Sequence, residues 1–288
     1  MILWFLLFAI IVAISFVLAY NSMQDFQEKA AVTTVENSLY LIRHPQGFTR
    51  EVLDSLHNQT VEKNYLLSIE RLFKGANSAF VIFGPKPILQ NFTAQLHLLE
   101  LENYTDIDDS QVTGWEMGVK DILSFHTSNL PNIFEKLPTL EKNEQFWWQI
   151  VLQPQKENLL AKILSNKDST INLIKRWLGF PTPFKTYDLV MNKTILTDPN
   201  TKQILSQKGS QRSFQAQVRC ILFMADDHKR RSLATNLENI GGNILVKVPR
   251  PITSPQMLAL YKTRSLPVTS ERSFLITTEE IQNLALKS

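Results

Sequence analysis

The chain has 288 residues, of which 44% are hydrophobic and 20% charged, and its net charge is +3. This composition predicts a packed core and argues against an intrinsically disordered protein. Only nine glycines occur, which argues against folds built on glycine-rich phosphate loops. The single cysteine, Cys220, excludes an internal disulfide and favours a reducing compartment.

The charge is unevenly distributed along the chain. Residues 1–154 contain 10 Lys/Arg and 17 Asp/Glu, a net charge of −7, whereas residues 155–288 contain 20 and 10, a net charge of +10. This asymmetry suggests that the distal half meets a polyanion, either nucleic acid or anionic lipid. The alternative is that the two halves attract each other, or that the basic side chains are simply solvated.

Residues 1–20 form an uncharged, apolar run in which Ser15 is the only distinctly polar side chain. As a helix this run would extend about 30 Å, the thickness of the hydrocarbon core of a bilayer. We therefore predict a single-pass anchor in the cell membrane, a polar juxtamembrane link at residues 21–31, and a cytoplasmic soluble part. The alternative is a cleaved signal peptide, although the basic residues that normally precede its apolar core are missing.

Residues 32–110 are predicted to form a first α+β unit. Apolar alternation and turn residues predict strands at 32–42, 66–73, 78–83 and 101–107. Helical spacing of apolar residues predicts helices at 48–56 and 87–100. The resulting order, β-α-β-β-α-β, is that of the ferredoxin-like (split βαβ) unit.

Residues 111–288 are predicted to form a second ferredoxin-like α+β unit, with a helical insertion at 156–208 and a C-terminal helix at 278–286. Strands are predicted at 115–123, 146–152, 214–224, 243–248 and 273–276, and further helices at 130–137 and 226–239. Strict alternation at 146–152 indicates a half-buried strand. The predicted fold class is thus α+β, with an N-terminal transmembrane helix followed by two ferredoxin-like units.

Motifs that would indicate catalysis do not occur in this sequence. It contains no P-loop, no Gly-x-Gly-x-x-Gly, no His-Glu-x-x-His and no Gly-x-Ser-x-Gly. We therefore predict no catalytic, cofactor-binding or metal-binding residues and no enzymatic activity, while a triad assembled only in space stays open.

Five basic residues are the best candidates for contacts to nucleic acid or to another anionic surface. They are Lys175, Arg176, Lys229, Arg230 and Arg231. The last three follow Asp226-Asp227, so the alternative is an ordinary helix start with acids at its positive end and solvated bases.

Three features together carry a family resemblance: the apolar span followed by a strand, the segment Glu144–Pro154 (Glu-Gln-Phe-Trp-Trp-Gln-Ile-Val-Leu-Gln-Pro), and the closing segment Phe274–Leu284 (Phe-Leu-Ile-Thr-Thr-Glu-Glu-Ile-Gln-Asn-Leu). In this order they resemble the membrane-proximal region that precedes the motor domain in coupling-protein-like ATPases of bacterial type IV secretion and conjugation systems, particularly those of candidate-phylum bacteria.

The resemblance implies a non-catalytic, membrane-anchored assembly or adaptor component of a secretion or DNA-transfer apparatus. In the family the closing segment leads into a nucleotide-binding motor, whereas this sequence stops at Ser288. We therefore expect a separate motor ATPase or secretion-complex subunit as partner, with DNA and self-association as further candidates. Two alternatives are a secreted or lumenal enzyme with a cleaved signal peptide, glycosylated at its Asn-x-Ser/Thr sites, and a structural membrane scaffold.

Overall fold

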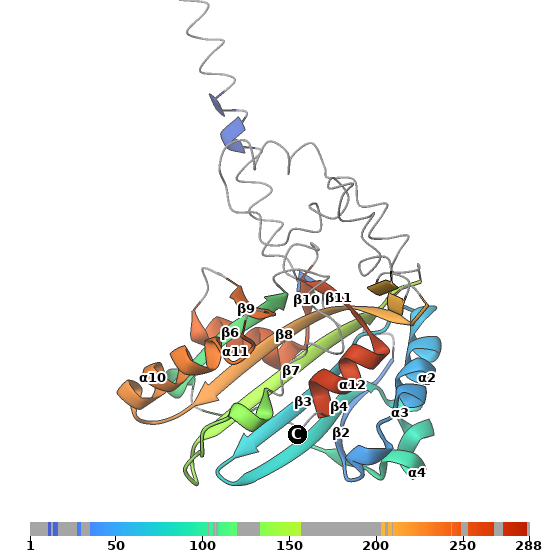
Figure 1. Ribbon diagram of the computed structural model, residues 1–288, viewed down its shortest axis with the longest axis horizontal. Helices are drawn as coiled ribbons and strands as arrows, with labels where there is room; N and C mark the ends of the chain where they lie inside the picture. The colour runs from blue at the N-terminus through green and yellow to red at the C-terminus, as the bar shows by residue number, and fades with distance from the viewer. Residues whose placement is uncertain are drawn as a thin grey trace, which may run out of the picture.

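The computed structural model is dominated by one broad antiparallel sheet with helices on both faces (Figure 1). It describes residues 11–12, 14–16, 28–29, 35–102, 104–105, 107, 109–119, 133–156, 203–204, 207–208, 210–242, 244–248, 253–267 and 273–286. The predicted α+β class is confirmed.

The first half of the sheet is built from four strands: β2 (Asn37–Ile42), β3 (Leu67–Lys74), β4 (Asn77–Pro85) and β5 (Leu98–Leu101). Helix α2 (Arg50–Val61) connects β2 to β3, and the turn at Gly75-Ala76 connects β3 to β4. Three short segments connect β4 to β5: α3 (Lys86–Leu89), η2 (Gln90–Phe92) and α4 (Thr93–Leu96). The strands lie in the order β5-β2-β4-β3, which is fourth, first, third, second in chain order.

The second half repeats this order. Its strands are β6 (Val112–Val119), β7 (Gln145–Pro154), β8 (Ser213–Phe223) and β9 (Leu245–Val248). Helix α10 (Asp227–Glu238) connects β8 to β9, and the strands lie as β7-β8-β6-β9. The two halves are joined edge to edge because β3 pairs with β7 over its whole length, from Leu67 opposite Leu152 to Lys74 opposite Gln145.

The closing part of the chain adds to this sheet. Strand β11 (Phe274–Thr277) pairs with the first residues of β8 and leads directly into α12 (Thr278–Leu286). Helix α11 (Ser254–Thr263) precedes the short strand β10 (Leu266–Pro267), which pairs with β1 (Glu28–Lys29). Short 3-10 turns complete the described elements: η1 (Pro45–Gly47), η3 (Asp109–Gln111) and η5 (Phe134–Lys136).

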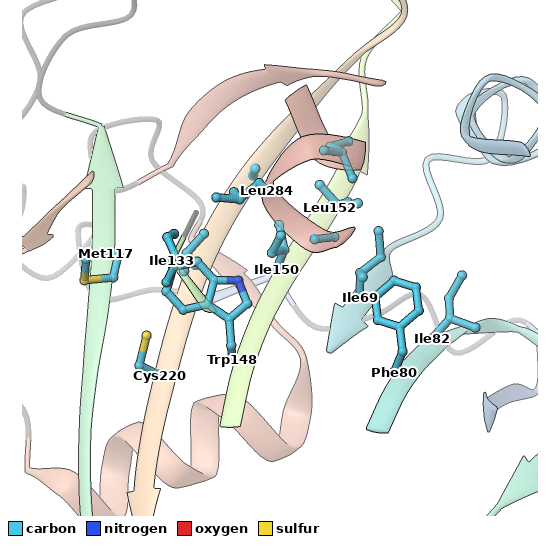
Figure 2. Packing of buried hydrophobic residues seen from close by; sticks show 14 of the residues in the cluster. Ile69, Phe80, Ile82, Met117, Ile133, Trp148, Ile150, Leu152, Cys220 and Leu284 are labelled. Carbon is cyan, nitrogen blue, oxygen red and sulfur yellow. The ribbon is translucent and has the colours of Figure 1, made fainter. Parts of the chain in front are cut away.

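The sheet is buried on both faces. On one face α2, α10 and α12 cover a large apolar cluster in which Trp148, Ile150 and Leu152 of β7 pack near Leu284 of α12 (Figure 2). On the other face Met257, Leu258 and Tyr261 of α11 pack against a second cluster with Trp147. The strand predicted at 146–152 is confirmed as part of β7, but the prediction that it is half-buried is wrong, because α11 covers the face that the alternation assigned to solvent.

Two other differences from the sequence prediction have local causes. The helix predicted at 87–100 is wrong in its second part, because the chain turns at His97 (φ +49°) and residues 98–101 pair with β2 instead. Helix α11 was not predicted, although Thr253 and Gln256 form a reciprocal capping box at its start. Both the β2–β5 pairing and the packing of α11 depend on contacts between residues distant in sequence.

The predicted membrane anchor at residues 1–20 falls largely outside the described residues. Within it, residues 11–12 and 14–16 are helical, and their apolar side chains are exposed. Nowhere in the described part of the chain is a helix both long and apolar enough to span a bilayer. Of the predicted insertion at 156–208, the structure describes residues 156, 203–204 and 207–208. Anchor and insertion stay predictions.

Candidate functional site

The predicted basic cluster lies on the first turn of α10. Asp226 is the N-cap, and its carboxylate accepts a hydrogen bond from the backbone N–H of Lys229 at 3.0 Å. Lys229 Nζ contacts the carboxylates of Glu141, at 2.6 Å, and Glu144. These contacts agree with the alternative of a helix start whose acids complement the positive end of the helix.

The two arginines of this cluster share one acid. Arg230 is buried and donates from Nη2 to Asp227 Oδ1 at 2.6 Å and from Nη1 to the carbonyl of Met224 at 2.6 Å. Arg231 is 77% exposed and contacts Asp227 Oδ2 at 2.7 Å. Binding of a phosphate here would compete with these ion pairs. Lys175 and Arg176 lie outside the described residues, so the nucleic-acid or anionic-surface contact stays a prediction.

The most concentrated polar chemistry of the described residues lies inside the protein, in a row across four adjacent strands. Glu70 of β3 stands opposite Gln149 of β7, Gln149 opposite Arg219 of β8, and Arg219 opposite Glu116 of β6. All four side chains are fully buried on the face that α11 covers. We call this set the buried polar row.

Glu70 is the most heavily bonded member of the buried polar row. Its Oε1 accepts hydrogen bonds from Ser68 Oγ at 2.6 Å, Gln149 Nε2 at 3.0 Å and Arg264 Nε at 2.8 Å. Its Oε2 accepts from Tyr104 OH and, at 3.4 Å, from Arg264 Nη2. Burial alone would raise the pKa of Glu70, but Arg264 and these donors outweigh it and hold the pKa below its ordinary value.

Two tyrosines and a tryptophan close this end of the row. The hydroxyl of Tyr104 lies 2.9 Å from that of Tyr261. Burial and the neighbouring Glu70 raise the pKa of both phenols well above the ordinary value, so both are neutral at physiological pH. The ring of Trp147 packs against both, with centroids 5.1 Å from Tyr104 and 5.6 Å from Tyr261. Trp147 and Trp148 are both buried and therefore do not offer a stacking surface to bases.

At the other end of the row, Arg219 forms a second buried ion pair. Its Nε lies 3.3 Å from Glu116 Oε1, and its Nη1 donates to the carbonyls of Leu260 at 3.0 Å and Ser265 at 2.7 Å. Leu260 belongs to the last turn of α11, and Arg264 is the residue that caps this helix. Both arginines thus bring positive charge to the negative end of α11.

The contacts of the buried polar row serve the packing of the protein. The Glu70 carboxyl group accepts five hydrogen bonds from side chains of the protein and is shielded from solvent, so its lone pairs are engaged inside the fold. The buried polar row instead fixes α11 in one position on the sheet, because any other position would leave buried charges without partners.

A third buried ion pair holds α12. Lys208 Nζ contacts Glu280, and both side chains are almost completely buried. Glu280 also accepts a hydrogen bond from the backbone N–H of Thr277 at 2.9 Å, while Thr277 Oγ1 accepts one from the N–H of Glu280 at 3.3 Å. This reciprocal pair is a capping box at the start of α12, the helix that was predicted at 278–286.

No sequence motif distinguishes the residues of the buried polar row. The available signal was a charged residue inside each of three apolar strands, namely Glu70, Glu116 and Arg219. Their pairing depends on strand order and register, which local sequence does not encode.

Within the described ranges, no group of three or more His, Cys, Asp or Glu side chains is arranged to hold a metal ion. Comparison with protein-family models and with curated proteins finds no match to this chain.

Proposed function

We propose that this chain is a membrane-anchored, non-catalytic assembly or adaptor component of a type IV secretion or DNA-transfer apparatus. The proposal combines the resemblance of the sequence to the membrane-proximal region of coupling-protein-like ATPases with the way in which the folded body is built.

Two ferredoxin-like units form the body in this proposal. The strand order fourth, first, third, second in residues 37–101, and again in residues 112–248, supports this assignment. Residues 144–154 and 274–284, which carry the resemblance, coincide with the central strand β7 and with the β11–α12 element that closes the sheet. The quoted segments are therefore parts of one core, as expected if they characterise a domain.

The observation that carries the proposal is the pairing of β1 with β10. Glu28 stands opposite Pro267 and Lys29 opposite Leu266, and Leu266 is buried against Leu66 and Val151. The eight residue-to-residue steps from Tyr20 to Glu28 can extend at most about 28 Å. A body tied in this way to a membrane-embedded residue 20 would stay close to the bilayer, as an assembly component requires.

The proposed partner is a separate motor ATPase or another secretion-complex subunit, which this body would hold at the membrane. Confinement to the membrane would raise the effective concentration of the two proteins for each other. DNA is a further proposed partner through Lys175, Arg176 and the basic residues of α10. Binding through phosphates should weaken steeply as salt is raised.

The decisive experiment is expression of the full chain followed by membrane flotation and intact-mass measurement. The proposal expects flotation with the membranes, resistance to carbonate extraction and an intact N-terminus. A soluble product lacking about twenty residues would favour the secreted alternative instead.

Affinity capture from the same detergent extract tests the partner. We expect a nucleotide-binding motor to be retained with the full chain. A matched capture with Glu70→Gln, which disturbs the folded body but leaves residues 1–20 unchanged, separates binding through the body from binding through the anchor. Capture of membrane neighbours alone would leave the structural scaffold as the function.

A further inference from the structure

The two outer strands of the eight-strand path are β5 and β9. Among the described residues β5 pairs only with β2, and β9 pairs only with β6. Every neighbouring pair on the path is antiparallel, and the path has an even number of strands. The two outer strands of one molecule therefore run in opposite directions.

The exposed residues of the two strands are complementary. Leu99 of β5 is 44% exposed and is the only large hydrophobic residue so exposed among the described residues outside the predicted anchor. Its neighbour Glu100 is an exposed acid whose Oε1 contacts Lys86 Nζ at 2.9 Å, and Lys247 of β9 is an exposed base whose Nζ contacts Glu238 Oε1 at 2.5 Å. Pairing between copies would place each of these side chains beside a second, opposite charge. Val246, beside Lys247, is partly exposed.

We propose that β5 of one molecule pairs with β9 of a second copy, extending the antiparallel sheet from one molecule to the next. In the proposed register Glu100 stands opposite Lys247, Leu99 opposite Val248, and Leu101 opposite Val246. The inference rests on the proposed function in one respect: the contact is short, and anchoring in one membrane is what brings the copies together at a high local concentration.

The register is supported by the faces on which these side chains lie. Residues paired across strands point to the same face. Glu70 stands opposite Val81, Val81 opposite Leu41, and Leu41 opposite Leu99, so Leu99 lies on the face that carries the buried polar row.

Val248 stands opposite Glu116, so it lies on that same face, and the alternation along a strand adds Leu101 and Val246. Glu100 and Lys247 both point to the other face. The proposed register thus joins apolar to apolar side chains on one face, where Val248 is already buried in its own molecule, and an acid to a base on the other.

Antiparallel pairing of two edge strands already connects the two halves within one molecule. Its halves are connected by antiparallel pairing of two strands, β3 and β7, each of which would be the outer strand of its own half. Strands β5 and β9 have only four residues each, so the new ladder is short and the contact is weak between molecules free in solution. Confinement to a membrane compensates by raising the local concentration.

Cysteine cross-linking of the full chain in membranes tests this register. The one native thiol, Cys220, is buried, so added cysteines report alone. We expect a mixture of Glu100→Cys and Lys247→Cys chains to form disulfide-linked dimers several-fold faster than either variant alone. A mixture of Glu100→Cys and Lys142→Cys measures random collision, because Lys142 is exposed in the turn before β7.

Exchange of the charges at positions 100 and 247 provides a second test of the register. Glu100→Lys and Lys247→Glu should each reduce cross-linking between a Leu101→Cys chain and a Val246→Cys chain. Each exchange also breaks an ion pair within its own chain, Glu100–Lys86 or Lys247–Glu238, so the urea midpoint of each variant is measured beside its cross-linking. The double exchange in one chain should restore it, because the opposed charges belong to different copies. No restoration would overturn the register.

The outcomes separate this inference from the proposed function. Flotation of the full chain with membranes, combined with cross-linking no faster than the collision control, overturns the edge pairing and leaves the anchored adaptor standing. Rapid cross-linking of Glu100→Cys alone would indicate pairing of two β5 strands and also overturns it. Efficient cross-linking of the mixture in a chain that does not float with membranes supports the edge pairing and removes the anchor.

Discussion

Arg264 and Glu70 are 194 residues apart in the chain, yet Arg264 Nε lies 2.8 Å from Glu70 Oε1 and both side chains are buried. Arg264 caps α11, and Glu70 lies in β3 of the first half of the sheet. The Cζ atom of Arg264 also lies 4.5 Å from the ring centroid of Phe83 in β4. One arginine of the closing part of the chain thus connects α11 to the first half of the sheet.

Replacement of Glu70 by Gln should destabilise the protein strongly. The change leaves the Arg264 guanidinium buried without a carboxylate, and loss of one partner of a buried ion pair typically costs about 3–5 kcal/mol. Urea unfolding of the full chain in detergent, followed by tryptophan fluorescence, measures this free energy. The double variant Glu70→Gln/Arg264→Met should recover much of the loss, because no unpaired charge remains.

A matched control for this prediction is Glu62→Gln. Glu62 forms an exposed ion pair with Lys156 at 3.2 Å. Exposed pairs contribute at most about 1 kcal/mol, so this variant should unfold almost like the parent chain. Equal losses for the exposed and the buried pair would contradict the structural role assigned to Glu70.

Acidification below pH 6.5 should destabilise the protein through His57. Its Nε2 lies 3.1 Å from the carbonyl oxygen of Gln155, its ring packs edge-on against Phe214, and burial lowers its pKa from the ordinary value of 6.5. The folded state therefore binds fewer protons than the unfolded state below this pH, so stability is complete above about 6.5 and declines as the pH falls.

The measurement is the urea midpoint at a series of pH values between 5 and 8. His57→Gln retains a donor for the Gln155 carbonyl but does not titrate, so its midpoint should decline less than that of the parent chain over this range. Parallel pH profiles for the two proteins would remove His57 as the cause.

Replacement of Gly114 by Ala should disturb the packing of α11 against β6 and destabilise the protein. A Cβ atom at Gly114 would lie 2.7 Å from Met257 Cγ and 2.9 Å from Ile221 Cδ1. Overpacking of this kind typically costs about 1–3 kcal/mol. Combining Gly114→Ala with Met257→Ala should cost less than the sum of the two single changes, because the loss of Met257 Cγ removes the shortest contact, while the Cβ of residue 257 stays 2.9 Å away. Strict additivity would show that Met257 does not restrict this position.

Cys220 should be unreactive in the folded protein. Burial raises the pKa of its thiol well above the ordinary value, so the reactive thiolate is scarce as well as inaccessible. Thiol titration with a chromogenic disulfide should detect almost no thiol in native buffer and one per chain in denaturant. Glu70→Gln, which should open the fold more often, should accelerate labelling. Immediate reaction of the native parent chain would contradict the burial of β8.

The sequence by itself determined those elements whose signal is local. The long alternating run of β8, the turn between β3 and β4 and the capped helix 278–286 were predicted close to their observed positions. Each depends on side-chain period or on hydrogen bonds between residues three or four apart, which neighbouring residues specify.

Only the tertiary structure decided how β7 is buried, where β5 begins and which charges meet. The polar positions of β7 resemble a solvated face, but α11, more than a hundred residues later, covers them. Lys229, Arg230 and Arg231 stand out in the sequence as a basic cluster, yet in the fold they pair with acids. Glu70, Gln149, Arg219 and Glu116 form one row only because strand register aligns them. Burial and charge pairing depend on contacts between distant segments, which no local pattern specifies.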